Sequence, residues 1–324
     1  MTHEPENMSP ESKNRFFPEE QKRLANRKNH LWLRARLVHE IRRFFLERNY
    51  LEVETPHLIP APPPEVHIDV IRAGDRYLHP SPELCMKRLL SAGYSRIFQI
   101  SKCFRNGERG SLHLPEFTLL EWYRTGIDYR ILMQECEALI VSVSKGIGIG
   151  DKVDYRGKAI DLSPPWERIS VVEAFNHYAS LNMETAFKKG CFDEVMVQEI
   201  EPNLGVTKPT LLYDYPASLA ALARLKPDNP EFAERFEIYI SGLELANGFS
   251  ELTDPQEQRA RFEKDQLKRR QSGKEVYPTA EKFLKSLEYM PEAAGIALGV
   301  DRLAMIFSDS PKIDDVVSFT PEEL

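Results

Sequence analysis

Hydrophobic positions follow helical spacing in some parts of this chain and strand-like runs in others. The longest helical pattern spans residues 30–48 and predicts an amphipathic helix whose apolar stripe serves either a core or a subunit interface. Further helices are expected at residues 83–93, 129–145, 170–178, 192–201, 255–271 and 282–289. Strands are expected at residues 50–56, 66–71, 77–80, 96–103, 116–124, 211–215, 233–240 and 243–252, and residues 294–306 read as a strand that turns into a helix.

The pattern indicates one large domain with a polar segment before it. Residues 1–29 are rich in charged and polar side chains, so we expect a flexible N-terminal tail. Residues 30–324 form the domain, with a small helical insert at about residues 146–208.

Composition narrows the class of protein. Apolar residues make up 42% and charged residues 29% of the 324 residues, as in soluble globular proteins. No apolar run reaches the roughly 18 residues that a membrane span needs, and the N-terminus lacks the apolar core of a secretory signal. The four cysteines contain no Cys-x-x-Cys pair, which favours reduced thiols in the cytoplasm. The net charge of -7 gives no support to broad nucleic-acid binding.

Residues 101–124 combine two strand patterns with a loop that carries chemical groups. The first strand ends at Arg105, the loop contains Gly107 and Gly110, and the second strand begins near Glu116. A cation at one lip and the aromatic Phe117 at the other suit a nucleotide, with Arg105 at its phosphates. The same pattern also fits an ordinary hairpin.

Residues 233–252 carry carboxylates on two adjacent strand patterns. Glu244 and Glu251 are an odd number of residues apart, so strict alternation would send them to opposite faces. A bend at Gly248 would restore a common face beside Asn247. Further on, the glycines of residues 294–299 permit close approach of a flat ligand, and Arg302 in the following helix calls for an anionic partner.

Another helix start carries a carboxylate. Ser81 before Pro82 is an N-cap arrangement, and it places Glu83 in the first turn of the helix. Interaction with the helix dipole alone would account for Glu83, so a binding role needs support from the rest of the chain.

Three blocks together resemble the class II aminoacyl-tRNA synthetases. Residues 34–56 resemble motif 1, residues 104–123 with Phe-Arg-Asn and Pro-Glu-Phe resemble motif 2, and residues 295–303 with Gly-Val-Asp-Arg resemble motif 3. Within the class, Ser-Pro-Glu at 81–83 and the Glu-x-x-Asn-Gly-Phe run at 244–249 are most similar to lysyl-tRNA synthetase. The likeness covers roughly residues 30 to 310.

Only about 30 residues precede motif 1, too few for the anticodon-binding barrel of a lysyl-tRNA synthetase. The chain therefore resembles the free-standing paralogues that ligate (R)-β-lysine to a lysine of translation elongation factor P. Ala297 stands where lysyl-tRNA synthetases usually have glycine, and the extra methyl group is expected to reshape the floor of the amino-acid pocket.

The resemblance implies an α+β fold with an antiparallel sheet flanked by helices, and a homodimer. It implies an enzyme that uses ATP and Mg2+ to form an acyl-adenylate of β-lysine or lysine, then transfers the acyl group to elongation factor P, with no tRNA and no membrane as partner. The implied catalytic residues are Arg105 and Arg302. The implied ATP site comprises Arg105, Asn106, Gly107, Glu108, His113, Leu114, Phe117, Glu244, Leu245, Gly299 and Arg302. The implied amino-acid site comprises Ser81, Pro82, Glu83, Glu121, Tyr123, Asn247, Glu251 and Ala297, and the implied Mg2+ ligands are Glu237 and Glu244.

Two departures from the family pattern lie in motif 2. Gly107 stands where the family commonly has glutamate, and Leu114 where it commonly has asparagine. Contacts to ATP are then lost or rerouted through Glu108. Two other functions stay open: a reduced enzyme that charges tRNA, and a degenerate sensor of an amino acid or nucleotide.

Overall fold

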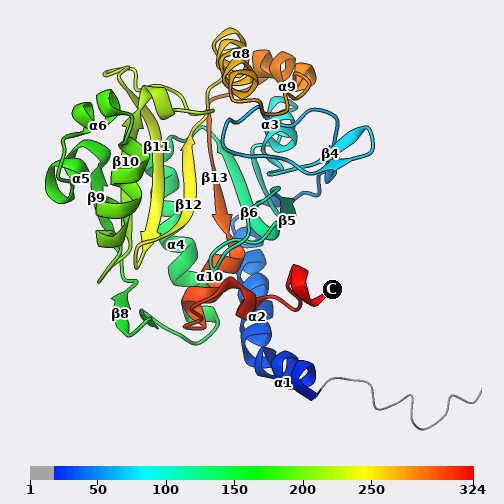
Figure 1. The fold of residues 1–324 in the computed structure, drawn as a ribbon, viewed down its shortest axis with the longest axis vertical. Coiled ribbons are helices and arrows are strands. Elements are labelled where there is room, and N and C mark those ends of the chain that lie inside the picture. Colours follow the sequence, from blue (N-terminus) through cyan, green and yellow to red (C-terminus); the bar gives the residue numbers. More distant parts are fainter. Residues whose placement is uncertain (1–17) are drawn as a thin grey trace, which may run out of the picture.

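A computed structural model describes residues 18–324 of the chain. Its centre is an eight-stranded sheet in which most neighbouring strands are antiparallel, while β1 with β5 and β9 with β10 run parallel (Figure 1). In spatial order its strands are β1 (Leu51–Glu52), β5 (Arg96–Phe104), β6 (Glu116–Thr125), β13 (Ala293–Gly299), β12 (Leu243–Ser250), β11 (Phe232–Ile240), β10 (Thr210–Pro216) and β9 (Glu167–Ser170). This arrangement confirms the predicted α+β fold.

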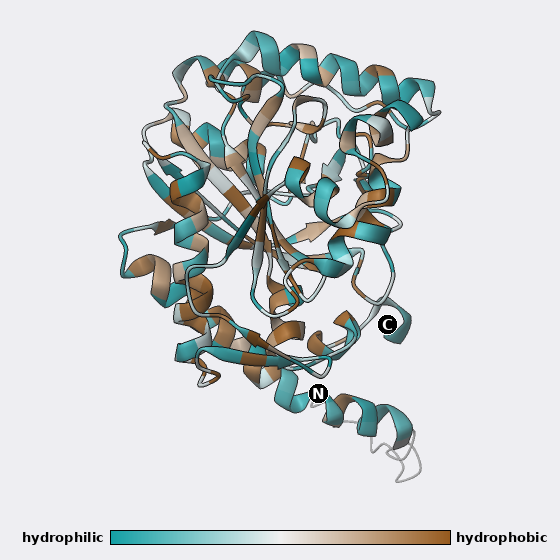
Figure 2. Cartoon of the chain, turned by 90° about the vertical axis from the view of Figure 1, so that its left-hand side faces the viewer, coloured by the Kyte–Doolittle hydropathy of each residue, from teal (hydrophilic) through white to brown (hydrophobic). Residues whose placement is uncertain are grey.

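Helices and two small sheets surround the main sheet. The helices are α1 (Pro18–Asn26), α2 (Lys28–Leu46), α3 (Glu83–Ser91), α4 (Tyr129–Gly146), α5 (Val171–Tyr178), α6 (Met183–Lys189), α7 (Phe192–Val195), α8 (Pro255–Gln271), α9 (Glu281–Ser286) and α10 (Val300–Phe307). The small sheets are β2 (Leu58–Ile59) with β4 (Arg76–Leu78) and β3 (Arg72–Ala73), and the hairpin β7 (Lys152–Tyr155) with β8 (Lys158–Asp161). The helix α8 at the top of the molecule is largely hydrophilic (Figure 2). Within residues 18–324, no helix combines the length and apolar character that a membrane crossing requires.

The structure corrects three details of the prediction. The flexible tail was predicted to reach residue 29, but α1 forms from Pro18, and residues 1–17 lie outside the described part. Residues 66–71 contain no strand. The insert at 146–208 is not only helical, because it contains the β7–β8 hairpin and contributes β9 to the main sheet.

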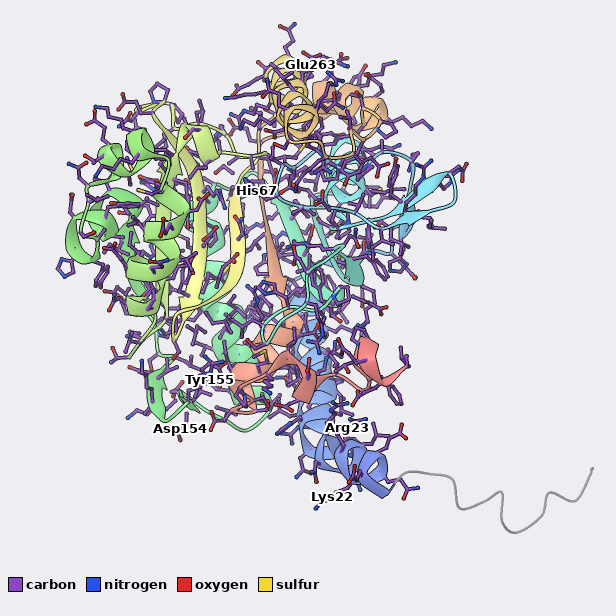
Figure 3. All side chains as sticks on the ribbon, viewed as in Figure 1. Lys22, Arg23, His67, Asp154, Tyr155 and Glu263 are labelled. Atoms are coloured by element: carbon purple, nitrogen blue, oxygen red, sulfur yellow. The ribbon has the colours of Figure 1, made fainter. Side chains whose placement is uncertain are left out.

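Tertiary contacts explain why the polar α1 is helical. Arg23 on α1 and Arg27, the residue that follows α1, both form ion pairs of 2.7 Å with Glu323 near the C-terminus. Figure 3 shows Lys22 and Arg23 at one end of the molecule and Glu263 of α8 at the opposite end. Glu323, which pairs with Arg23 of α1, lies about 300 residues away in the sequence. The pattern of residues 18–26 alone therefore did not predict this helix.

One face of the sheet forms the main core. Leu120 and Trp122 of β6 are fully buried in the cluster that also contains Leu37 and Ile41 of α2. The apolar stripe of α2 therefore serves the core of its own chain. Because side chains alternate along a strand, the residues between them, such as Glu121, face the opposite side of the sheet.

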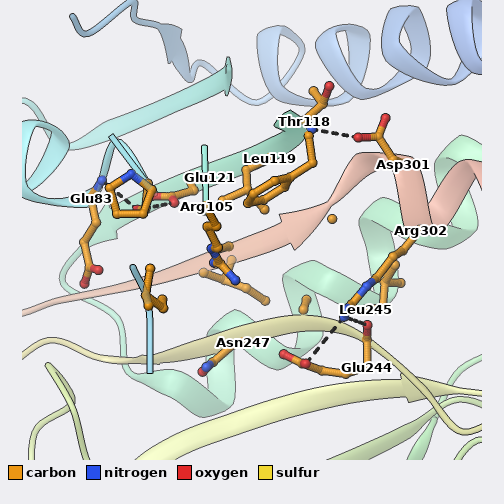
Figure 4. Close-up of a pocket in the computed structure, with 18 of the residues that line it drawn as sticks. Glu83, Arg105, Thr118, Leu119, Glu121, Glu244, Leu245, Asn247, Asp301 and Arg302 are labelled. Atoms are coloured by element: carbon orange, nitrogen blue, oxygen red, sulfur yellow. Dashed lines mark hydrogen bonds and ion pairs between the residues drawn. The ribbon is translucent and has the colours of Figure 1, made fainter. Parts of the chain in front are cut away.

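The carboxylate of Asp301 joins three elements at the edge of that core. Its Oδ1 accepts hydrogen bonds from Nε and Nη2 of Arg34 on α2, at 3.0 and 2.8 Å. Its Oδ2 accepts from the backbone N–H of Thr118 on β6 at 2.7 Å (Figure 4). Asp301 is 2% exposed, so these contacts replace its water and fix α2, β6 and α10 relative to one another.

Replacing Asp301 with asparagine is expected to lower the free energy of unfolding by about 3 kcal/mol, at the lower end of the range for breaking a buried pair, because Arg34 remains partly exposed. Urea denaturation followed by circular dichroism measures this change. The matched control is Asp228→Asn, an exposed carboxylate, for which we expect a change below about 0.5 kcal/mol. Equal unfolding midpoints for the two variants would contradict the role given to Asp301.

Candidate active site

A cavity of about 310 Å³ lies on the sheet face opposite α2 and α4. Strands β6, β12 and β13 form its floor, and side chains of different chemistry line its two ends (Figure 4). One end, the arginine end, contains Arg105, Glu108, His113, Phe117, Glu244 and Arg302. The other, the acidic end, contains Ser81, Glu83, Glu121, Tyr123 and Asn247.

At the arginine end, Arg105 lies over the ring of Phe117 with 5.0 Å between the guanidinium carbon and the ring centroid. Its only ion pair within the described residues is a loose one of 3.7 Å with Glu108, and its buried Nε has no hydrogen-bond partner there. The guanidinium of Arg105 contacts only one aromatic ring and one distant carboxylate, so it still has N–H donors that can bind a phosphate oxygen.

Arg302 connects three parts of the site. Its Nη1 donates to the backbone oxygen of Glu244 at 2.6 Å, and its Nη2 donates to Nε2 of His113 at 2.7 Å. Burial, followed by the charge of Arg302, lowers the pKa of His113, so the ring is neutral at pH 7 and accepts this hydrogen bond. His113 therefore positions the guanidinium of Arg302 at the mouth of the cavity.

The two departures in motif 2 have different structural consequences. Gly107 has a positive φ of 77°, which glycine adopts without strain, and neither Gly107 nor Asn106 lines the cavity. Leu114 is 4% exposed and packs into the main core while it lines the cavity wall. Glu108 lines the cavity and pairs with Arg105 at 3.7 Å.

At the acidic end, Glu121 of β6 is held by two neutral donors. Its Oε1 accepts from the hydroxyl of Ser81 at 2.6 Å and its Oε2 from the hydroxyl of Tyr123 at 2.8 Å. Ser81 also accepts from the backbone N–H of Glu83 at 3.0 Å, which is the N-cap contact predicted for it. Burial, together with the charge of Glu83, raises the pKa of Glu121 to about 8.

Lys87 on α3 is a residue of this site that the sequence prediction missed. Its Nζ lies 2.6 Å from Oε1 of Glu83 and 2.5 Å from Oε2 of Glu251. Oε1 of Glu251 is buried and has no hydrogen-bond partner among residues 18–324. Burial raises the pKa of Glu251 to about 8, although Lys87 lowers it. The spacing of four residues from Glu83 puts Lys87 on the same helix face, and that signal was available in the sequence.

An irregularity in β12 brings Glu244 to the same face as Asn247. The register with β11 pairs Glu244 with Tyr239 but Ala246 with Ile238, so the extra residue is Leu245. The predicted bend at Gly248 is therefore wrong in position, because Gly248 stays in regular register with Phe236.

Glu237 is less open than its expected role as a metal ligand requires. Its Oε2 accepts from Tyr215 and Tyr239 at 2.6 and 2.7 Å, and its Oε1 from Arg235 at 2.6 Å. Glu237 is 8% exposed and does not line the cavity, whereas the side chain of Glu244 is 40% exposed. No cluster of three or more acidic, histidine or cysteine side chains in residues 18–324 is arranged as a metal site.

Most of the predicted site residues come together at this cavity. Pro82, Asn106, Gly107, Glu237 and Glu251 do not line it, although Glu251 lies beside Gly295, a residue of the floor. The lining residues predicted from sequence are Ser81, Glu83, Arg105, Glu108, His113, Leu114, Phe117, Glu121, Tyr123, Glu244, Leu245, Asn247, Ala297, Gly299 and Arg302.

Glu65, which the sequence prediction also missed, lines the cavity. Burial, followed by the charge of Glu83, raises its pKa to about 7. It lies in a loop after three prolines, where no strand or helix pattern assigns its direction. The backbone oxygen of Glu65 accepts from the buried Arg269 of α8 at 2.7 Å, which fixes the loop against the cavity.

Comparison with known proteins gives three results. The family model of class II tRNA synthetases (D, K and N) matches residues 13–323. The elongation factor P–(R)-beta-lysine ligases of Vibrio cholerae and Haemophilus influenzae are each 40% identical; the matches cover 88% and 91% of this chain, and 93% and 95% of those proteins. The lysine–tRNA ligase of Moorella thermoacetica is 38% identical over 88% of this chain, which spans only 64% of its length.

The raised pKa values predict that binding of a diammonium ligand strengthens as the pH rises. Below about pH 8 Glu121 and Glu251 are largely protonated, and an ammonium group must displace those protons. From pH 6 to pH 8 we expect the affinity for lysine to rise about tenfold per pH unit for each proton displaced. The charged and titratable groups that face these two carboxyls are Glu83 and Lys87 of α3 and Tyr123 of β6.

Isothermal titration calorimetry with lysine at several pH values measures this dependence. Norleucine, which has the same chain with one ammonium group fewer, is the matched control and should show a smaller rise. A lysine affinity that stays constant from pH 6 to pH 8 would show that the buried carboxyls do not receive the ammonium groups.

Proposed function

Because this chain belongs to the class II tRNA synthetases of the D, K and N type, we propose that it is an ATP-dependent ligase acting on elongation factor P. It activates (R)-β-lysine or lysine as an acyl-adenylate and transfers the acyl group to a lysine side chain of that factor. The names of the Vibrio cholerae and Haemophilus influenzae relatives support the acceptor and the amino acid. The observation that carries the proposal is one cavity that joins an acidic end to an end with two arginines.

The acidic end would bind the two ammonium groups of the amino acid. The unpartnered Oε1 of Glu251 can accept one ammonium group, and Glu83 with Glu121 supplies acceptors for the other. Ala297 pairs in register with Glu121 on one side and with Asn247 on the other, so its methyl group limits the floor between them. Ser81, Pro82 and Tyr123 complete the proposed amino-acid site.

The arginine end would bind ATP. Arg105 would contact the α-phosphate, where charge develops during adenylate formation, and Arg302 would contact the γ-phosphate. Phe117 would stack on the adenine ring once Arg105 turns to the phosphate. The proposed ATP site further includes Asn106, Gly107, Glu108, His113, Leu114, Glu244, Leu245 and Gly299.

Mg2+ fits this site through Glu244 in particular. The partly exposed carboxylate of Glu244 faces the cavity, and Mg2+ in such sites takes one or two carboxylates plus phosphate oxygens. Bound there, the ion would neutralise phosphate charge. Glu237 is the second proposed ligand, and it would have to release one of its tyrosine or arginine donors.

The proposed reaction has two balanced steps. In the first, a carboxylate oxygen of the amino acid attacks the α-phosphorus of ATP, and the bond to the β-phosphate oxygen breaks to release pyrophosphate. In the second, the unprotonated amine of the acceptor lysine attacks the acyl carbon, AMP leaves with the bridging oxygen, and the amide nitrogen loses a proton to solvent. Positioning of the reactants supplies the main rate gain, and no covalent enzyme intermediate is needed.

The proposal places the enzyme in the cytoplasm, in keeping with its four free cysteines. Charging of tRNA remains a second candidate because the Moorella thermoacetica lysine–tRNA ligase is 38% identical. Lysylation of total tRNA, measured beside the protein assay, distinguishes the two.

Incubation of elongation factor P with the enzyme, ATP and (R)-β-lysine is expected to add the mass of one lysyl residue, read by intact-mass spectrometry. Arg302→Ala is the control and should lower the rate by at least about 100-fold, because it removes charge stabilisation at the phosphates. Parallel reactions with lysine and without ATP define the substrate and the requirement for ATP. No mass increase, together with labelled tRNA, would overturn the proposal in favour of tRNA charging.

We further propose that the protein is a homodimer. Trp32 near the start of α2 is 65% exposed and Leu46 at its end is 56% exposed, so α2 presents large apolar side chains to solvent that a partner subunit would bury. Light scattering at micromolar concentration is expected to give twice the chain mass. Trp32→Lys would weaken the dimer if this surface forms it, and a monomeric wild type would exclude it.

A further inference from the structure

Lys87 is an internal cation within the proposed amino-acid site. Its side chain is 1% exposed, and its ion-pair partners are Glu83 of the acidic end and the fully buried Glu251. Its ammonium also lies 4.9 Å from the ring centroid of Phe249, which lines the cavity. Few lysines are buried to this degree, and this one is buried beside the site.

The charges at the acidic end do not balance within the protein. Glu83, Glu121 and Glu251 bring three carboxyl groups, and Lys87 brings one ammonium group. Glu121 receives only neutral hydroxyl donors, so it gains no compensating charge. The buried Glu65 beside Glu83 adds a further carboxyl group, so this end holds more carboxyl groups than Lys87 alone can neutralise and suits a ligand with more than one ammonium group.

The geometry shows where a ligand ammonium would enter. Lys87 occupies Oε2 of Glu251, while the buried Oε1 has no partner among the described residues. A Cβ atom added to Gly295 would lie 2.7 Å from that Oε1, and Gly295 lines the cavity floor. The unpaired oxygen thus lies beside a residue of the cavity floor, and the ion-paired oxygen faces α3.

We propose that Lys87 determines the ligand charge that this pocket accepts, by permanently neutralising one of its carboxyl groups. Without Lys87, three carboxyls would face one another at close range, and like charges at that distance are relieved by uptake of protons. With Lys87 in place, its charge lowers the pKa of both Glu121 and Glu251, so an entering cation displaces their protons more easily than it would without Lys87. Lys87 is in this sense a specificity-determining residue that acts through Glu83 and Glu251 and does not touch the reacting atoms.

The ammonium of Lys87 is itself held in its charged form. Burial works against its charge, but Glu251 and Glu83 outweigh burial and raise the pKa of Lys87 above its ordinary value. It is therefore neither a base nor a nucleophile at neutral pH. The competing explanation is a purely structural ion pair that attaches α3 to the end of β12.

The test compares Lys87→Met with the wild type in ATP–pyrophosphate exchange. The inference rests on the proposed function, so the wild type must first show exchange with 3,6-diaminohexanoate, which is β-lysine. In Lys87→Met at pH 7 we expect KM for this amino acid to rise about 30-fold or more and KM for ATP to change less than about twofold. The loss should shrink as the pH is raised toward 9, because the protonated carboxyls then ionise.

Measurements of selectivity and of chemical rescue distinguish an electrostatic role of Lys87 from a purely structural one. The preference of the wild type for 3,6-diaminohexanoate over 3-aminohexanoate should fall at pH 7 in Lys87→Met and recover at high pH. In Lys87→Ala, ethylammonium should restore activity, whereas ethanol should not, because only the former supplies the missing cation. Met86→Leu, a buried change on α3 that conserves volume, is the control and should leave KM and selectivity unchanged.

Three outcomes would overturn the inference. The first is an unchanged pH profile and selectivity in Lys87→Met, and the second is loss of ATP and amino-acid binding in equal proportion. The third is equal restoration of Lys87→Ala by ethanol and ethylammonium. Absence of exchange by the wild type with any diammonium amino acid would instead refute the proposed function.

Discussion

The carboxylate of Asp301 ties together the three segments on which the cavity depends. By accepting from Arg34 of α2 and from the backbone of Thr118, it fixes β6 between the core helices and α10. Arg302, the next residue, then extends from α10 to His113 and to the backbone of Glu244. The Asp301–Arg34 ion pair therefore fixes the position of the arginine end. Because side chains alternate along β6, fixing this strand also fixes Glu121 on the cavity face of the sheet.

At the acidic end, burial of the carboxyl groups determines how they bind a ligand. Carboxyl groups removed from water hold their protons more tightly, and the pKa of both Glu121 and Glu251 rises to about 8. A cation entering such a site replaces protons as well as water, so affinity and selectivity depend on pH. The charge of Lys87 lowers the pKa of both carboxyl groups and so offsets part of the effect of burial. The proposed preference for a diammonium amino acid follows from the charges that remain.

Sequence pattern predicted the strands that form the cavity floor, because their alternation and glycines are local properties. It also brought Arg105, Phe117, Glu121 and Arg302 together through the family resemblance, and all four line the cavity. It failed where distant parts of the chain decide the local structure. Helix α1 pairs through Arg23 with Glu323, and the extra residue at Leu245 depends on pairing with β11. Lys87 was missed although its spacing from Glu83 was visible, since a lysine four residues after a glutamate usually lies on a solvated helix face.

The central claim is that one cavity activates an amino acid carrying two ammonium groups. ATP–pyrophosphate exchange by the wild-type enzyme, with (R)-β-lysine compared to (R)-3-aminohexanoate at pH 8, tests it most directly. The two compounds differ only by the terminal ammonium group. We expect kcat/KM to be at least about 100-fold higher for (R)-β-lysine, since a buried carboxyl left without its cation costs several kcal/mol. Equal exchange with both compounds, or none with either, would contradict it.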